Sequence, residues 1–174
     1  MQCVRAKFLP GLAVVALLLA ACDSSRDTQV AAAPAAGFTC TARASGVAGL
    51  PGEWQPFAAD IDDCALHGAD GLVALHVITV SASRFYARQS SGAATVDLPK
   101  PLIISATGKQ IGRLPYNYPD DPPLASTLAF EDWRDGLPRT IRIAVTDPTV
   151  TGDHDLSMAW QESRGEYVGG TEEK

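Results

Sequence analysis

Asp147, Asp153 and Asp155 place three carboxylates within nine residues, next to the end of an expected strand. Ca²⁺ prefers hard oxygen ligands, and carboxylates on one loop at the end of a sheet can supply them. These three residues are therefore the candidate metal ligands, and Ca²⁺ is the candidate cofactor. The alternative is a soluble Asp- and Gly-containing turn in which Asp153 or Asp155 accepts hydrogen bonds from nearby backbone N–H groups.

A second candidate site is the segment 114–123, LPYNYPDDPP, whose four prolines exclude regular structure. Tyr116 and Tyr118 offer rigid, amphipathic contact area of the kind enriched in binding surfaces. Asp120 and Asp121 add negative charge to the same loop. We interpret these four residues as candidate partner-binding residues. The alternative is a structural crossover loop whose Tyr rings pack on the sheet.

Histidines are the remaining candidates for acid–base chemistry, and the chain has three of them. His76 lies within an apolar strand, where a single histidine usually has a structural role. His154 is the one histidine with neighbouring carboxylates, Asp153 and Asp155. The sequence has no HExxH, GxSxG, P-loop or SxxK motif. We therefore name no catalytic residue, while an enzyme assembled from distant residues stays open.

The first 22 residues, MQCVRAKFLPGLAVVALLLAAC, have the organisation of an export signal. Arg5 and Lys7 precede an apolar run, residues 8–19, that is too short to span a bilayer as a helix. The following Leu19-Ala20-Ala21-Cys22 resembles the lipobox of bacterial lipoproteins. That resemblance implies cleavage before Cys22 and acylation of its thiol with diacylglycerol. An ordinary secretory signal and a retained transmembrane anchor are the alternatives.

This resemblance also implies where in the cell the protein would be located. Residues 1–21 would be the signal peptide, and Cys22 would anchor the protein by its acyl chains, palmitate among them, in the bacterial cell envelope, facing the periplasm. Asp23 resembles the signal that keeps lipoproteins of enteric bacteria in the inner membrane. Residues 22–37 have no period that could bury a face, so we expect a flexible tether before a domain that begins near Phe38.

The charge of the chain narrows the class of partner. Removing Arg5 and Lys7 from 14 basic residues leaves 12, against 20 acidic ones, so the mature net charge would be −8. Such an acidic chain is not expected to bind nucleic acid, or to bind a membrane surface through a polybasic patch. About 150 residues are enough to bury one good core, so a single domain is expected.

Of the four cysteines, only two would remain available to form a disulfide. Cys3 would leave with the signal peptide, and the lipid would occupy Cys22. Cys40 and Cys64 would then lie in an oxidising compartment, where a disulfide is the expected outcome. In the chain-entropy model such a loop would stabilise the fold by roughly 3 kcal/mol.

Short apolar or alternating segments separated by turn residues predict an all-β fold. Residues 140–146 and 156–160 alternate clearly and predict an antiparallel pair joined by a long loop. Residues 72–80 are apolar on both faces and predict a central strand. The expected strands are 72–80, 85–88, 95–98, 102–105, 140–146 and 156–160, with a short helical turn over 57–66.

We therefore predict an antiparallel β-sandwich or barrel-like sheet over residues 38–164, followed by a mobile tail, 165–174, without a buried face. The favoured function is a non-catalytic protein-binding module, either an inhibitor or immunity protein or an accessory factor of envelope assembly. One alternative is an envelope hydrolase acting on cell-wall glycan or peptide. The other is a Ca²⁺-stabilised binding module.

Overall fold

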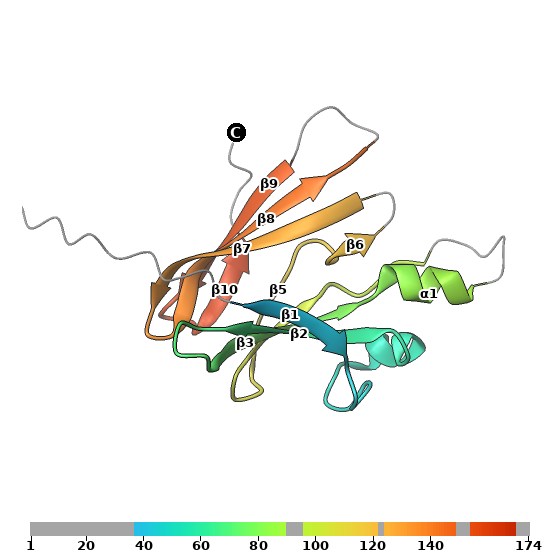
Figure 1. The fold of residues 1–174 in the computed structure, drawn as a ribbon, viewed down its shortest axis with the longest axis horizontal. Coiled ribbons are helices and arrows are strands. Elements are labelled where there is room, and N and C mark those ends of the chain that lie inside the picture. The colour runs from blue at the N-terminus through green and yellow to red at the C-terminus, as the bar shows by residue number, and fades with distance from the viewer. Residues whose placement is uncertain (1–36, 90–95, 122–123, 149–153, 170–174) are drawn as a thin grey trace, which may run out of the picture. The chain divides into compact units, whose positions relative to one another are not determined.

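Two antiparallel five-stranded sheets make up the domain (Figure 1). The computed structural model describes residues 37–89, 96–121, 124–148 and 154–169. Each sheet is a meander in which consecutive strands are neighbours. The expected all-β sandwich is confirmed, and the sheets do not close into a barrel.

The first sheet contains the strands of the N-terminal half in the order β1-β2-β3-β4-β5. They are β1 (Phe38–Ala42), β2 (Ile61–His67), β3 (Val73–Val80), β4 (Leu102–Ser105) and β5 (Gln110–Arg113). A 3₁₀ helix, η1 (Gly52–Phe57), precedes β2, and the helix α1 (Ala82–Arg88) follows β3.

The second sheet contains the remaining strands in the order β10-β9-β8-β7-β6. They are β6 (Asp120–Asp121), β7 (Leu124–Arg134), β8 (Leu137–Thr146), β9 (His154–Gln161) and β10 (Glu166–Gly169). The expected pairing of 140–146 with 156–160 is confirmed, with Ile141 opposite Met158 and Ile143 opposite Leu156.

Strand β3 is buried on both faces, as its apolar sequence predicts. Leu75 and Val77 point into the core between the two sheets, where they meet Ile141 and Ile143 of β8. On the opposite face, Ile78 and Val80 belong to a second core. Aromatic and aliphatic residues of η1, α1, β2, β4 and the segment before β4 complete that second core, namely Trp54, Phe57, Ile61, Ala82, Phe85, Leu98 and Leu102.

Helix α1 is fixed to the first sheet by two ion pairs. The Arg84 guanidinium donates to both carboxylate oxygens of Asp62, at 2.7 and 3.2 Å. Arg88, one turn further along the helix, pairs with Asp60, which is only 1% exposed. Because Arg84 and Arg88 are four residues apart, they share one face of the helix and reach two carboxylates that flank Ile61.

The prediction of a helical turn over 57–66 is wrong. η1 ends at Phe57, and Ile61–His67 is strand β2. Asp is unfavourable in strands, which hid the alternation of Ile61, Asp63 and Ala65 with Asp62, Cys64 and Leu66. Within β2, Asp62 pairs with Arg84 of α1 and Asp63 pairs with His76 of β3, so tertiary contacts override the local preference.

The prediction of a strand over 85–88 is also wrong, because these residues lie in α1. Ser81 caps this helix by accepting a hydrogen bond from the Arg84 N–H. Ala82 and Phe85 then bury one helical face. Of the strand expected over 95–98, Thr95 lies outside the described residues, and residues 96–98 have no regular structure.

The prediction that residues 165–174 lack a buried face is wrong for 166–169, which form β10. Tyr167 is buried against Trp160, and its hydroxyl donates to the Pro138 carbonyl. Burial raises the pKa of the Tyr167 phenol, and the charge of Arg139 opposes this only in part. Residues 170–174 lie outside the described residues.

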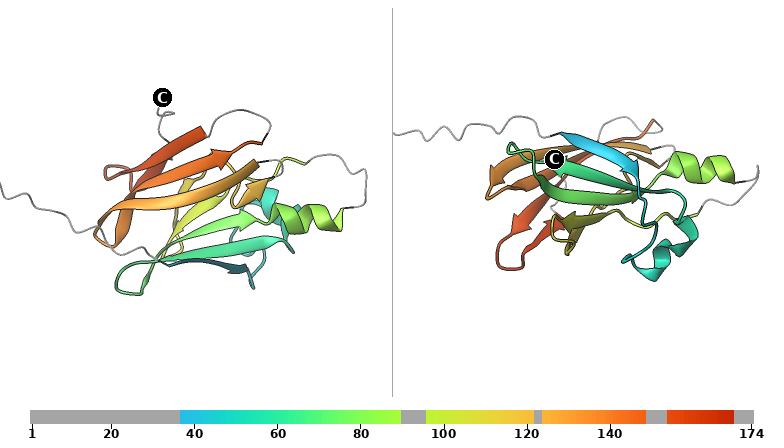
Figure 2. Two further views of the ribbon diagram at one scale, coloured as in Figure 1. Left: turned by 45° about the horizontal axis from the view of Figure 1, so that its top comes forward. Right: turned by 60° about the horizontal axis from the view of Figure 1, so that its bottom comes forward.

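Strand β10 lies against β5, so these two strands bring one edge of each sheet together (Figures 1 and 2). Gly112 of β5 makes this close approach possible. A Cβ at this position would lie 3.1 Å from Ile103 Cδ1 and 3.1 Å from Tyr167 Cβ. The edges formed by β1 and by the two-residue β6 lie elsewhere in the sandwich.

In the described ranges, no helix is long and apolar enough to cross a bilayer.

We expect the substitution Arg88→Ala to lower the free energy of unfolding by about 3 kcal/mol, since it leaves the buried Asp60 carboxylate without its cation. Urea unfolding measures this change. The matched control is Arg164→Ala, which removes an exposed pair with Glu166 and should cost less than about 1 kcal/mol. Equal losses in the two variants would contradict the assigned role of Arg88.

Candidate functional site

The three residues expected to bind Ca²⁺ are only partly described by the structure. Asp147 follows the end of β8, and Asp155 lies within β9, opposite Ala144, instead of on the loop. Its carboxylate is 3.4 Å from the guanidinium of Arg142. Asp153 lies outside the described residues, and the side chains that are described include no group of three metal-binding residues. The Ca²⁺ site stays a prediction.

The segment with the two expected contact tyrosines connects the first sheet to the second. The Tyr118 ring packs against Phe38, with 5.5 Å between ring centroids, and the Tyr118 carbonyl accepts a hydrogen bond from Thr79 at 2.6 Å. Partial burial raises the pKa of the Tyr118 phenol. Lys100 lies 5.4 Å from the ring centre of Tyr116. Both rings are half-buried against the inter-sheet core, as the crossover interpretation expects.

Asp120 and Asp121 extend that segment as β6, which pairs with Leu124 and Ala125 of β7. Their side chains lie outside the described residues. The assignment of Tyr116, Tyr118, Asp120 and Asp121 to partner binding therefore stays a prediction, and the structure describes only their backbone setting and the packing of the two rings.

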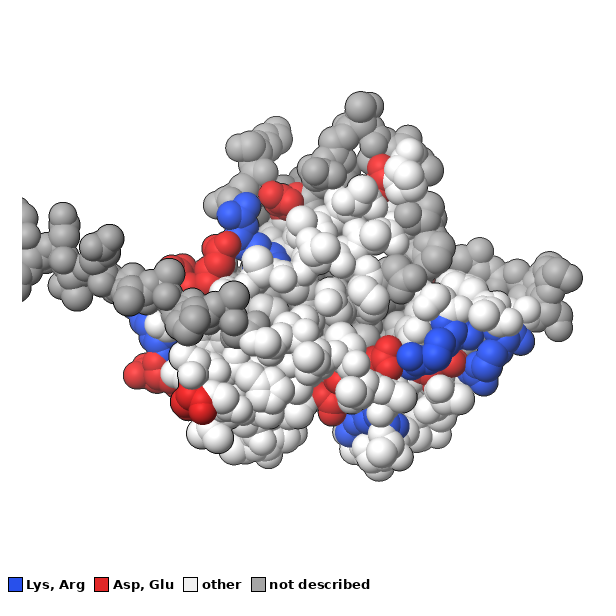
Figure 3. Space-filling model, viewed as in Figure 1, with Lys and Arg blue, Asp and Glu red and all other residues white. Residues whose placement is uncertain are grey.

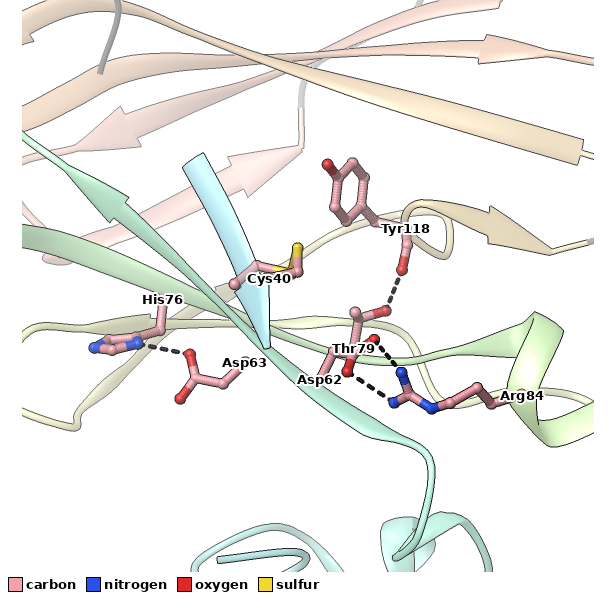
Figure 4. The surroundings of a disulfide bond; sticks show 8 residues. Cys40, Asp62, Asp63, His76, Thr79, Arg84 and Tyr118 are labelled. Atoms are coloured by element: carbon pink, nitrogen blue, oxygen red, sulfur yellow. Dashed lines mark hydrogen bonds and ion pairs between the residues drawn. A yellow bond between two sulfur atoms is a disulfide. The ribbon is translucent and has the colours of Figure 1, made fainter. Parts of the chain in front are cut away.

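The expected disulfide between Cys40 and Cys64 is confirmed (Figure 4). It joins residues that lie directly opposite each other on β1 and β2. Cys64 is fully buried in the inter-sheet core, whereas Cys40 is exposed on the outermost strand. The bond therefore fixes the register of an edge strand to the core.

The exposed strand β1 is the most accessible part of the first sheet. Thr39, Cys40, Thr41 and Ala42 are all exposed, and Phe38 is half-buried. The strand contains no charged residue and no proline, two common means of protecting a sheet edge. Figure 3 shows few charged side chains on the central part of this face, where Figure 1 places β1.

The hydrogen bonds at the two ends of β1 indicate which backbone groups are available. The His67 N–H donates to the Gly37 carbonyl, and the Arg43 N–H donates to the Ile61 carbonyl. Hydrogen-bonded pairs alternate along an antiparallel ladder. The backbone groups of Phe38, Cys40 and Ala42 therefore point away from β2, towards the open edge.

A pair of titratable side chains, Asp63 and His76, lies on the outer face of the first sheet. The Nδ1 atom of His76 is 2.7 Å from a carboxylate oxygen of Asp63, and the side chains are 28% and 30% exposed (Figure 4). Asp63 points away from the core, on the side of β2 opposite to Asp62 (Figure 4). Each carboxylate of the Asp60, Asp62 and Asp63 cluster thus has its own basic partner.

Asp63 and His76 line a pocket of about 270 Å³. Its floor consists of Ile78 and Ile104, which lie next to His76 on β3 and β4. One wall is the loop after β1, with Arg43, Gly49 and Leu50, and the other is the turn between β4 and β5, residues 105–108. The pocket lining therefore combines charged and polar side chains with aliphatic ones.

The arrangement of this pair determines what His76 can do. A carboxylate that accepts the Nδ1–H of a histidine fixes its orientation and leaves Nε2 as a hydrogen-bond acceptor, a base or a ligand. We refer to Asp63, His76, Arg43 and the aliphatic floor as the outer-face pocket.

Sequence reasoning missed this pocket, because it assigned residues 57–66 to a helical turn and gave His76 a structural role. The signal was present in the strand 61–67, the Gly68–Gly71 turn and the strand 73–80, which together form a hairpin. In that hairpin Asp63 lies opposite Ile78, and His76 lies opposite Ala65, so the two polar side chains are diagonal neighbours on one face. The expected pairing of His154 with Asp153 or Asp155 involves side chains outside the described residues.

Comparisons of the chain with protein-family models, curated proteins and solved structures find no match.

We expect the neutral form of His76 to carry its proton on Nδ1, because Asp63 accepts a hydrogen bond from this proton. The substitution Asp63→Ala removes the acceptor and should increase the population protonated at Nε2. Nitrogen NMR of the imidazole rings distinguishes the two tautomers, and His67, which lies outside the pocket, is the internal control. An Nε2-protonated His76 in the unaltered chain would contradict the assigned pair.

Proposed function

We propose that this chain is a lipoprotein tethered to the bacterial cell envelope through Cys22, and that its sandwich binds a protein partner at strand β1. The tether rests on the lipobox resemblance of residues 19–22. The binding function rests on one observation, the exposed and uncharged edge of β1.

An edge strand of this kind can pair with an extended segment of another protein. Outward-pointing N–H and C=O groups supply the affinity, and the alternate side chains supply the specificity. Phe38, Cys40 and Ala42 provide these backbone groups, and the disulfide holds the strand in one register. The strongly acidic chain would favour a partner with basic groups flanking the added strand.

Such a module would act by binding to its partner and not by catalysing a reaction. An inhibitor or immunity protein uses binding in this way, as does an accessory factor of envelope assembly. Both need a rigid surface held close to the membrane, and the acylated Cys22 and the disulfide would supply the tether and the rigidity.

The tether is tested by Cys22→Ser, which removes the thiol that would carry the lipid. We expect this variant to lose incorporation of labelled fatty acid and to leave the membrane fraction. Cys3→Ser is the matched control, since Cys3 lies in the expected signal peptide and its loss should change neither property. A Cys22→Ser chain that stays acylated and membrane-bound would overturn the proposal.

The binding edge is tested by Ala42→Pro, which removes an outward N–H and places a ring on the open edge without breaking a bond to β2. Ala42→Val keeps the N–H and is the matched control. When each chain is used to capture proteins from envelope extracts, the unaltered chain and Ala42→Val should retain the same stoichiometric partner. Ala42→Pro should bind it at least about tenfold more weakly. Circular dichroism and the intact disulfide verify that each variant is folded.

Equal capture by Ala42→Pro and Ala42→Val would show that the partner does not use β1. Recovery of no stoichiometric partner by the unaltered chain would count against the binding function itself.

A further inference from the structure

We propose that the outer-face pocket binds the C-terminal residue of a peptide that ends in an aliphatic amino acid. This site lies on the outer face of β2, β3 and β4, whereas the proposed function uses the open edge of β1. The inference therefore stands without the proposed function. It rests on three chemical features that line one pocket.

The first feature is a hydrogen-bond acceptor in a fixed direction. Asp63 holds the Nδ1 side of His76 at 2.7 Å, so Nε2 is the ring nitrogen left for a ligand. With Nδ1 protonated, Nε2 accepts a hydrogen bond. The group that fits it is a donor such as the N–H of a peptide bond.

The second feature is a positioned cation. The Arg43 guanidinium donates to the Gly46 carbonyl at 2.8 Å and to the Ala48 carbonyl at 3.1 Å. These two bonds hold the side chain against its own loop, and a guanidinium has five N–H donors in all. Arginine recognises carboxylates especially well, because its planar fork matches the two carboxylate oxygens.

The third feature is the aliphatic part of the lining. Leu50, Ile78 and Ile104 present hydrocarbon surface between the polar groups. The pocket volume of about 270 Å³ is below the roughly 300–1,000 Å³ of pockets that enclose drug-sized ligands. One amino-acid residue is therefore a suitable occupant, and a longer chain would have to continue outside.

A C-terminal aliphatic residue supplies all three complementary groups at once. Its carboxylate would bind Arg43, its amide N–H would bind His76 Nε2, and its side chain would cover the aliphatic floor. Asp63 sets the orientation, since its negative charge repels a carboxylate from the His76 end and leaves the Arg43 end for it. An internal aliphatic residue has no carboxylate to offer to Arg43.

Calorimetric titration of the purified full-length chain tests the proposal with N-acetyl-alanyl-leucine and its C-terminal amide as paired probes. The two differ only in the terminal carboxylate. We expect the acid to bind at least about tenfold more tightly than the amide, the difference produced by one charge-assisted hydrogen bond. This comparison needs no substitution at Arg43, which also braces its loop.

His76→Ala should weaken binding of the acid by at least about tenfold. His67→Ala is the matched control, because it removes a histidine side chain that lies outside the pocket. The affinity of this variant for the acid should be unchanged. Ala42→Pro should also leave this affinity unchanged, which separates the pocket from the β1 edge.

Three results would overturn the proposal. The first is absence of binding by the acid to the folded chain, and the second is equal binding of the acid and the amide. The third is unchanged affinity in a His76→Ala chain that retains its disulfide and its circular dichroism spectrum.

Discussion

The burial of strand β3 on both faces is the constraint on which the other features depend. One face of β3 forms the core with the second sheet, and the other requires a cover of its own. Helix α1 and the 3₁₀ helix η1 supply that cover only over part of the outer face. His76 and Asp63 lie on the part of the outer face that these helices do not cover. The pocket therefore exists because the helices cover only part of a sheet that is apolar on both sides.

Charged groups are used close to this core in two different ways. Asp60 and Asp62 are almost completely buried, and their ion pairs with α1 determine where the helix lies. Asp63 follows them directly, yet it points to the other side of β2 and pairs with a partly exposed histidine. Because successive side chains of a strand point to opposite faces, Asp62 faces α1 and helps to fix the helix, whereas its neighbour Asp63 faces the outer-face pocket.

Much of the fold could be predicted from the sequence wherever alternation was clear. The antiparallel pair of β8 and β9, the central strand β3 and the disulfide follow from local patterns and from the counting of cysteines. Strand β2 could not be recognised, because its Asp62 is stabilised by Arg84, 22 residues further along the chain, and its Asp63 by His76 on the next strand. The outer-face pocket could not be predicted for the same reason, since Asp63 and His76 become neighbours only when β2 and β3 form a hairpin. Tyr167 shows the same limit, because a short polar segment gives no sign of a partner strand that covers it.

The meander order of the strands has a consequence for the growing chain. Every strand pair of the first sheet is complete once residue 113 has been made, and each pair joins strands that are consecutive in the chain. Pairs of consecutive strands close shorter loops than pairs of strands that lie far apart in the sequence. The inner face of that sheet, with Leu66, Leu75 and Val77, then has no cover until β8 follows. A chain that stops between these points would expose this apolar inner face to solvent, as aggregation-prone folding intermediates do.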